Sequence, residues 1–290
     1  MAFGYGHEAR RGPAPSPTVN RSVPITVTLA VAWTLGAAFC LWLLLSASVA
    51  YRPSSATDVV QLGGIEALVF VASVLWVLRV HGGDGSLAQS LGLRPTHPAL
   101  PVLAVFLGFL LHFPAESIDA WVQRFRPESG QEVAAEAALL ASDTPARLIL
   151  VLVVIACVGP FVEELFFRGA LFSALRKSHS LLMTTVVVSA CFVIGHLNMG
   201  RWPALSVVAL TITYVRAVSG SLLPALALHV AFNAATVLAF ATGVATLGPS
   251  RVDLIPAALG TVAAACLLGG IRYVATRAPV ARRGRAEDAE

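Results

Sequence analysis

The stretch VGPFVEELFFRGAL, residues 158–171, places three charged side chains inside an otherwise apolar run. An ionisable residue at membrane depth costs on the order of 2.5–3.5 kcal/mol on insertion scales, so each of these charges needs a partner or a use. Glu164 and Arg168 are four residues apart, on one face of a helix, where they can pair. Glu163 lies about 100° around the helix axis and has no partner at that spacing. It is therefore the carboxylate that we expect to do chemistry, as a general base or acid.

The rest of the chain has the composition of a membrane protein. Of its 290 residues, 57% are hydrophobic and only 12% are charged, which predicts an all-α polytopic membrane protein. Apolar runs that can cross about 30 Å of hydrocarbon recur along the whole length. The sequence predicts about eight transmembrane helices, at 23–50, 59–80, 99–113, 148–172, 181–199, 203–219, 222–243 and 252–271.

The basic residues predict an orientation. With eight spans and a cytoplasmic N-terminus, most of the 20 Lys and Arg residues fall on the cytoplasmic side, in agreement with the positive-inside rule. We therefore expect a multi-pass protein of the cell membrane with both termini in the cytosol. The net charge of +4 fits attraction to anionic lipid, and no alternation of basic and aromatic residues indicates nucleic acid as a partner.

The chain divides at changes of composition. A polar, Pro-rich N-terminus and a polar C-terminus are expected to be disordered cytoplasmic tails, and an acidic connection is expected to lie outside the membrane on the opposite side. The polar residues at membrane depth follow that connection. The predicted segments are a tail at 1–22, three spans in 23–113, the acidic loop at 114–146, a catalytic membrane core at 147–245, a last span in 246–275 and a tail at 276–290.

Three more polar side chains lie in later apolar runs. His196 ends the segment FVIGH, and His229 and Asn233 open and close HVAFN, four residues apart on one helix face. Together with Glu163 they could surround one water and one substrate carbonyl. A rise of 1.5 Å per residue puts Glu163 roughly 18–20 Å and His196 about 22 Å from the cytoplasmic end, but His229 only about 10 Å. The site therefore requires the helix of His229 to start deeper or to tilt.

These segments also carry a family resemblance. EELFFR, FVIGH and HVAFN fit the motifs E-E-x-x-x-R, F-x-x-x-H and H-x-x-x-N, in that order and on successive membrane segments. The chain resembles the CPBP family of intramembrane proteases, also called the type II CAAX prenyl endopeptidase or ABI family, in its bacterial form. The resemblance covers roughly residues 145–245 and implies an endopeptidase that cleaves a membrane-associated or lipidated peptide or protein.

The resemblance also implies roles for single residues. Glu163 would activate the hydrolytic water, with His196 helping to hold it. His229 and Asn233 would stabilise the oxyanion of the tetrahedral intermediate. Glu164 and Arg168 would support the site or orient the substrate. No cofactor is then required.

Three alternatives share these residues. Glu163, His196 and His229 could instead hold zinc, with water as the fourth ligand. The buried carboxylate and imidazole groups could form the proton relay of a transporter. The chain could also be a non-catalytic protein of the bacteriocin-immunity type.

Two other polar residues are expected to have simpler roles. Glu66, near the outer end of the second span, is expected to pack or to meet lipid head groups. Arg216, at the inner end of the sixth span, is expected to extend its side chain to the interface.

Overall fold

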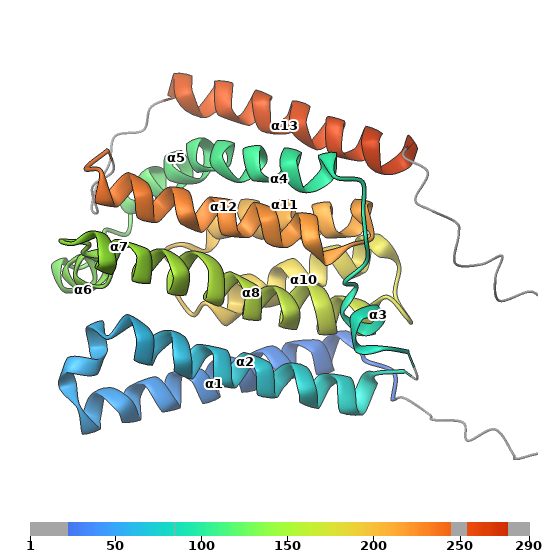
Figure 1. Cartoon of the computed structure of the whole chain (residues 1–290), viewed down its shortest axis with the longest axis horizontal. Helices are drawn as coiled ribbons and strands as arrows, with labels where there is room; N and C mark the ends of the chain where they lie inside the picture. Colours follow the sequence, from blue (N-terminus) through green and yellow to red (C-terminus); the bar gives the residue numbers. More distant parts are fainter. Residues whose placement is uncertain (1–22, 84, 245–253, 278–290) are drawn as a thin grey trace, which may run out of the picture.

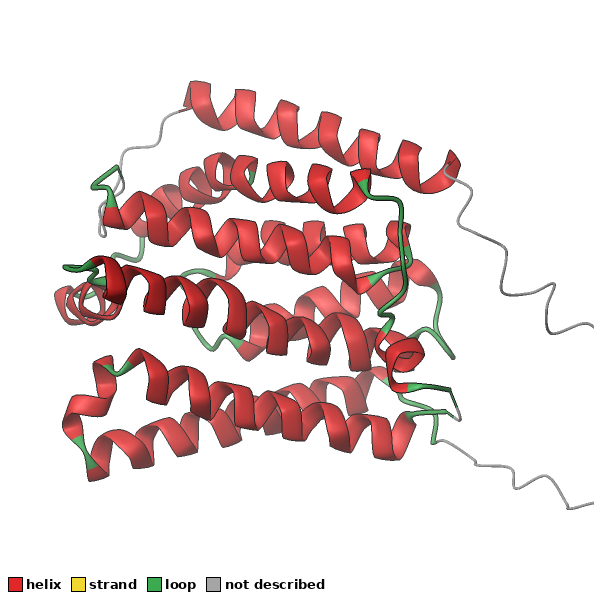
Figure 2. Cartoon of the chain, viewed as in Figure 1, coloured by secondary structure: helices red, strands yellow, loops and turns green. Residues whose placement is uncertain are grey.

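The structure is a computed structural model that describes residues 23–83, 85–244 and 254–277. In these residues the secondary structure is entirely helical (Figure 2). The two predicted tails fall almost wholly outside the described residues. The α-helices are α1 (Val27–Tyr51), α2 (Val59–His81), α3 (Leu87–Leu91), α4 (Ala99–Leu110), α5 (His112–Gln123), α6 (Gly130–Leu140), α7 (Pro145–Val151), α8 (Gly159–Glu164), α9 (Phe172–Leu175), α10 (Leu181–Gly195), α11 (Trp202–Ser219), α12 (Leu222–Ala241) and α13 (Leu254–Arg277).

Three further helical segments complete the chain. A short 3₁₀ helix, η1 (Pro53–Thr57), joins α1 to α2. Two π-helical segments, η2 (Leu152–Val158) and η3 (Leu165–Leu171), interrupt the fourth membrane helix, so that α7, η2, α8, η3 and α9 form one continuous rod.

The prediction of an all-helical polytopic membrane protein is confirmed. Seven helices in the described ranges are long and apolar enough to cross a membrane, and α10 is a shorter apolar helix. The third span is longer than predicted, because α4 and α5 together form one apolar rod from Ala99 to Gln123 instead of ending at 113. Residues 130–140 form α6, so the acidic connection at 114–146 is largely helical.

One end of the helix bundle gathers the starts and ends of many helices. The N–H of Val23 donates to the carbonyl of Val80, and the hydroxyl of Ser178 donates to the carbonyl of Ile25. The described N-terminal and C-terminal residues also lie at this end, to the right in Figure 1. We call it the basic end, because Arg94, Arg176, Lys177 and Arg216 lie around one pocket there. When the shorter α10 is counted with the seven long helices, the described chain passes along the bundle an even number of times, so both described ends lie at this end.

The helices pack in layers around the fourth rod. The hairpin of α1 and α2 lies on one side of this rod, α12 lies on the other, and α4, α5 and α13 follow beyond α12 (Figure 1). α4 packs tightly against α12. A Cβ atom on Gly108 would lie 2.5 Å from the carbonyl oxygen of Leu228, so only glycine allows this spacing. The spacing matters because His229 is the next residue on α12.

Candidate active site

The fourth rod changes its hydrogen-bond register just before the two glutamates. The N–H of Gly159 donates to the carbonyl of Val154, five residues back, as in a π-helix. In that register the carbonyl of Ile155 would accept a hydrogen bond from the N–H of residue 160, but Pro160 has no N–H. The side-chain amide of Asn233 donates to the Ile155 carbonyl instead, at 3.1 Å. The sequence therefore explains both the widened turn and the attachment of α12 to it.

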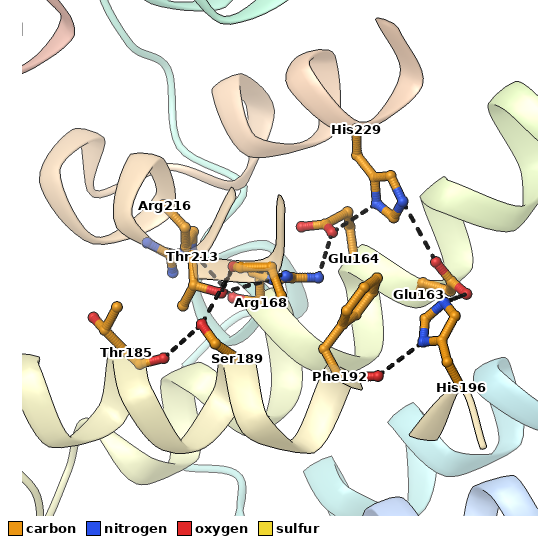
Figure 3. A network of polar contacts seen from close by, with 11 residues as sticks. Glu163, Glu164, Arg168, Thr185, Ser189, Phe192, His196, Thr213, Arg216 and His229 are labelled. Carbon is orange, nitrogen blue, oxygen red and sulfur yellow. Dashed lines mark hydrogen bonds and ion pairs between the residues drawn. The ribbon is translucent and has the colours of Figure 1, made fainter. Parts of the chain in front are cut away.

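Glu163 lies between two imidazole rings. Its Oε1 is 3.7 Å from Nε2 of His196, and its Oε2 is 3.7 Å from Nε2 of His229 (Figure 3). Both separations are longer than a hydrogen bond. The carboxylate thus meets one ring nitrogen with each oxygen, from two different helices.

The opposite nitrogen of each ring is held by an acceptor. Nδ1 of His196 lies 2.8 Å from the carbonyl oxygen of Phe192, and Nδ1 of His229 lies 2.9 Å from Oε1 of Glu164. Because these partners accept hydrogen bonds, each Nδ1 carries the proton in the neutral ring. Both Nε2 atoms can then interact with Glu163 or with a ligand beside it.

Glu164 and Arg168 form the ion pair that their spacing predicts. Nη1 of Arg168 is 2.8 Å from Oε1 of Glu164, and both side chains are 0% exposed. The remaining guanidinium contacts go to α11, where Nε donates to the hydroxyl of Thr213 at 3.1 Å and Nη2 to the carbonyl of Ala209 at 3.2 Å. A buried ion pair is tolerated only when its remaining N–H groups also have hydrogen-bond acceptors. The pair therefore connects the fourth rod to α11 and, through Glu164, to His229 on α12.

Phe192 packs between the guanidinium of Arg168 and the ring of His196. Its ring centroid is 4.4 Å from that of His196 and 5.7 Å from that of His229. The guanidinium of Arg168 lies over the ring, 4.2 Å from its centroid. The aromatic residue of FVIGH thus fixes both imidazole planes and covers the charge behind them.

His229 reaches the level of Glu163 because α12 starts inside the bundle. The N–H of Leu222 donates to the carbonyl of Gly92, and the hydroxyl of Ser221 donates to the carbonyl of Arg94. The connection between α2 and α4 therefore covers the start of α12. Leu222 is fully buried there. The sequence required the helix of His229 to start deeper or to tilt, and in the structure α12 starts deeper.

The site is open on the side of His196. α10 has 15 residues, about 22 Å at the standard rise, and it ends at Gly195 instead of the predicted 199. Leu197 follows with a φ of 51°, a left-handed conformation that turns the chain away from the helix axis. The His196 side chain is 35% exposed, against 12% for Glu163 and 6% for His229. Water can reach the carboxylate from this side.

A pocket of about 230 Å³ reaches Glu163 from between α2, α6, the fourth rod and α12. Its polar lining comes from Glu163, Asn233 and Glu66. The Glu66 carboxyl group lies beside Gly159, four residues before Glu163 on the fourth rod, where its Oε2 would be 3.4 Å from a Cβ atom on that glycine. Glu66, for which a packing or head-group role is expected, therefore lines the same pocket as Glu163.

The structure thus brings together all six residues that the sequence singles out. Glu163, His196 and His229 meet directly, Asn233 lines the same pocket, and Glu164 with Arg168 supports His229. Two relationships were not found by sequence reasoning. Glu66 comes from a span without any motif, and the contact between Glu164 and His229 joins residues 65 positions apart.

The side chains around Glu163 do not have the spacing of a metal site. Within the described ranges, no group of three or more His, Cys, Asp or Glu side chains has the geometry to hold one. The nitrogen–oxygen separations of 3.7 Å around Glu163 would have to shorten before these side chains could share zinc.

Comparison with known proteins identifies this part of the chain. Residues 145–235 match the family model described as type II CAAX prenyl endopeptidase Rce1-like. The matched segment begins at α7 and ends in α12, and it contains every site residue named above except Glu66. The expected family resemblance is thus confirmed over this segment. Searches of curated proteins and of solved structures each gave no match.

Proposed function

We propose that this multi-pass membrane protein, which carries an Rce1-like type II CAAX prenyl endopeptidase segment at residues 145–235, is an intramembrane endopeptidase. The observation that carries the proposal is the position of Glu163, one carboxylate oxygen toward each Nε2 of His196 and His229. A carboxylate flanked by two anchored imidazoles has the groups that hydrolysis by water requires.

Glu163 is the base in the proposed reaction. It takes a proton from a water held beside His196 on the open side of the site, and the water oxygen bonds to the carbonyl carbon of the scissile peptide. A tetrahedral intermediate with a negative oxygen forms. When the carbon–nitrogen bond breaks, Glu163 returns the proton to the leaving amine, so the products are a carboxylic acid and a free amine.

His229 and Asn233 act on the oxygen that becomes negative. To donate from Nε2, His229 must carry a second proton, and Glu164 at Nδ1 stabilises that cation. The amide nitrogen of Asn233 has two hydrogens. One is engaged by the carbonyl of Ile155, and the other is available toward the pocket.

Glu66 has a positioning role in this scheme. Its carboxyl group lines the same pocket as Glu163, on the side of α2. It also fixes the side of the Glu163 carboxyl group that faces α2. Glu66 does not need to touch the substrate to do so.

The proposed substrate is a membrane-associated or lipidated peptide or protein, and the proposed location is the cell membrane with both termini in the cytosol. The apolar lining of the Glu163 pocket, which includes Val59, Leu62, Leu139 and Val154, supports a substrate with an apolar segment. The matched family description supports a prenylated C-terminal peptide as the first compound to test.

The test is cleavage of a farnesylated CAAX peptide by the purified full chain in detergent. We expect Glu163→Gln to lower kcat by at least about 10²-fold, as for removal of a general base. Glu116→Gln is the matched control, because that side chain is 64% exposed on α5 and far in sequence from the site. Equal cleavage by the wild type and Glu163→Gln would refute the proposal. Cleavage by neither would favour the non-catalytic alternative.

A zinc-dependent form of the same reaction is the second candidate. The observation that favours it is that Nδ1 of both histidines is hydrogen-bonded to an acceptor, as is usual for histidines that bind a metal through Nε2. Zinc would be held by Glu163, His196 and His229 and would supply a more acidic bound water. Metal analysis of the purified protein, with cleavage measured after chelation, separates the two. Full activity without bound metal would leave the metal-free reaction.

A further inference from the structure

A second and larger pocket lies at the basic end of the bundle. It encloses about 560 Å³ where α2 and α9 end, beside the connection that contains α3. It has no lining residue in common with the pocket at Glu163. Its role is therefore separate from the proposed hydrolysis.

The pocket is lined by four cationic side chains. The cations are Arg94, Arg176, Lys177 and Arg216. Arg176 donates to the carbonyl of His179, and Lys177 donates to that of His81 at 2.7 Å, so each has a neutral acceptor. Like charges gathered in this way repel one another, and an anion between them would remove the repulsion.

Arg216 is the buried member of this group. It is only 6% exposed, its Nε donates to the carbonyl of Arg168 at 3.1 Å, and its guanidinium lies 4.8 Å from the ring centroid of Phe172. Figure 3 places it beside Thr213, at the opposite edge of the network from His196. Neither of its Nη atoms has a hydrogen-bond acceptor in the part of the chain that the structure describes. A buried guanidinium with two free donors is suited to bind phosphate.

The other walls of the pocket fit the rest of a phospholipid. Ser90, Gln89 and Ser173 add polar groups near the cations, while Val77, Leu78 and Leu181 are apolar. Leu181 is the first residue of α10 and is 43% exposed, so part of this apolar side is open to the surroundings of the bundle. A free phosphate ion would use only the cations, whereas a lipid would use both surfaces.

We propose that this pocket binds the phosphate head group of an anionic phospholipid. Basic pockets between membrane helices are known as sites for such head groups. The contact from Arg216 to the carbonyl of Arg168 places the bound lipid next to η3, on the opposite side from Glu163. Lipid binding is expected to hold the end of the fourth rod in place.

The test uses the full chain in detergent with phosphatidylglycerol, phosphatidylcholine or inorganic phosphate, and native mass spectrometry counts bound lipid. We expect phosphatidylglycerol to bind at least tenfold more tightly than phosphatidylcholine. The double variant Arg94→Gln/Lys177→Gln should lose that preference, and both side chains are exposed, so the fold should survive. Arg272→Gln is the matched control, because it removes an exposed arginine of α13 that is not in the pocket.

Two results would overturn the proposal. One is an unchanged preference for phosphatidylglycerol in the double variant, which would place the lipid elsewhere. The other is displacement of the lipid by millimolar inorganic phosphate, which would make the pocket a site for a free anion. Cleavage of the CAAX peptide is not needed as a readout, so failure of the proposed protease function would leave this test unaffected.

Discussion

Nδ1 of His229 lies 2.9 Å from Oε1 of Glu164, and the same oxygen accepts a hydrogen bond from Nη1 of Arg168 at 2.8 Å. The adjacent glutamates therefore have different partners. Glu163 faces the two Nε2 atoms, whereas Glu164 joins a fixed cation to one of the rings. This arrangement explains why a site with two carboxylates also needs the arginine of EELFFR.

The first prediction concerns this shared oxygen. Arg168→Met leaves the charge of Glu164 buried without its main partner, so we expect the free energy of unfolding to fall by about 3–5 kcal/mol. The double variant Glu164→Gln/Arg168→Met removes both charges and should recover part of that loss. Unfolding in mixed detergent micelles measures both. A double variant that is less stable than Arg168→Met alone would contradict this account of the pair.

The second prediction concerns Glu66. If it positions Glu163, Glu66→Gln should lower kcat for the CAAX peptide by about tenfold and leave KM unchanged, because a lost positioning interaction acts in the transition state only. The exposed Glu116→Gln serves again as the control. A change in KM alone would assign Glu66 to substrate binding, against the role proposed here.

Much of this arrangement follows from local sequence rules. The apolar runs predict the helices, and the four-residue spacing predicts the pair of Glu164 with Arg168 because neighbours on one helix face need no tertiary information. The contact between His196 and Glu163 also agrees with their similar distances from the cytoplasmic end, counted at the helical rise along straight spans. These parts depend only on helix geometry.

The remaining parts depend on contacts between segments distant in sequence. His229 reaches Glu163 because Leu222 is bonded to Gly92, and no spacing within α12 contains that information. Glu66 joins the site because α2 packs against the fourth rod. Arg216 is buried beside Phe172 instead of extending to the interface, because the backbone carbonyl of Arg168 offers it an acceptor inside the bundle.

The third prediction concerns the close packing of α4 on α12. In Gly108→Ala the new methyl group would meet the carbonyl of Leu228 and the Cβ of Ala231, so α12 must move. We expect a loss of about 1–3 kcal/mol in stability and reduced cleavage, since His229 moves with the helix. Gly36→Ala is the matched control, because nothing lies within 4 Å of a Cβ there. Equal effects of the two substitutions would show that helix propensity, not packing, decides the result.

The fourth prediction concerns the ion pairs that hold α6 over the site. Nε of Arg201 donates to Glu128 at 2.9 Å, and the two Nη groups donate to Glu136. Burial alone would lower the pKa of Arg201, but the hydrogen bonds to Glu136 and Glu128 outweigh it and raise the pKa above its ordinary value. The cation is therefore present at every working pH.

Arg201→Gln should accordingly lower the free energy of unfolding by about 1 kcal/mol, within the range of partly exposed pairs. High salt should lower the free energy of unfolding of the wild-type protein toward that of the variant, because exposed charges are screened. Arg124→Gln, at an exposed arginine that caps the end of α5, is the control. A stability difference that does not depend on salt would mean that packing of the arginine stem, not its charge, is responsible.

The last prediction tests the origin of the π-helical turn before Glu163. Asn233→Ala leaves the carbonyl of Ile155 without its donor, which should cost about 1–3 kcal/mol of stability, the usual penalty for an orphaned buried acceptor. Pro160→Ala restores a backbone N–H at the position that the π register assigns to this carbonyl. In the Pro160→Ala background, Asn233→Ala should therefore cost markedly less.

The two effects can be separated in a double-mutant cycle on unfolding, with cleavage of the CAAX peptide as an independent readout. Coupling of at least about 0.5 kcal/mol between positions 160 and 233 would support the shared acceptor. Cleavage should still fall in both Asn233→Ala proteins, because the proposed oxyanion donor is lost whether or not the carbonyl is satisfied. Additive stability changes would mean that Pro160 does not cause the free carbonyl, and unchanged cleavage would remove Asn233 from the reaction.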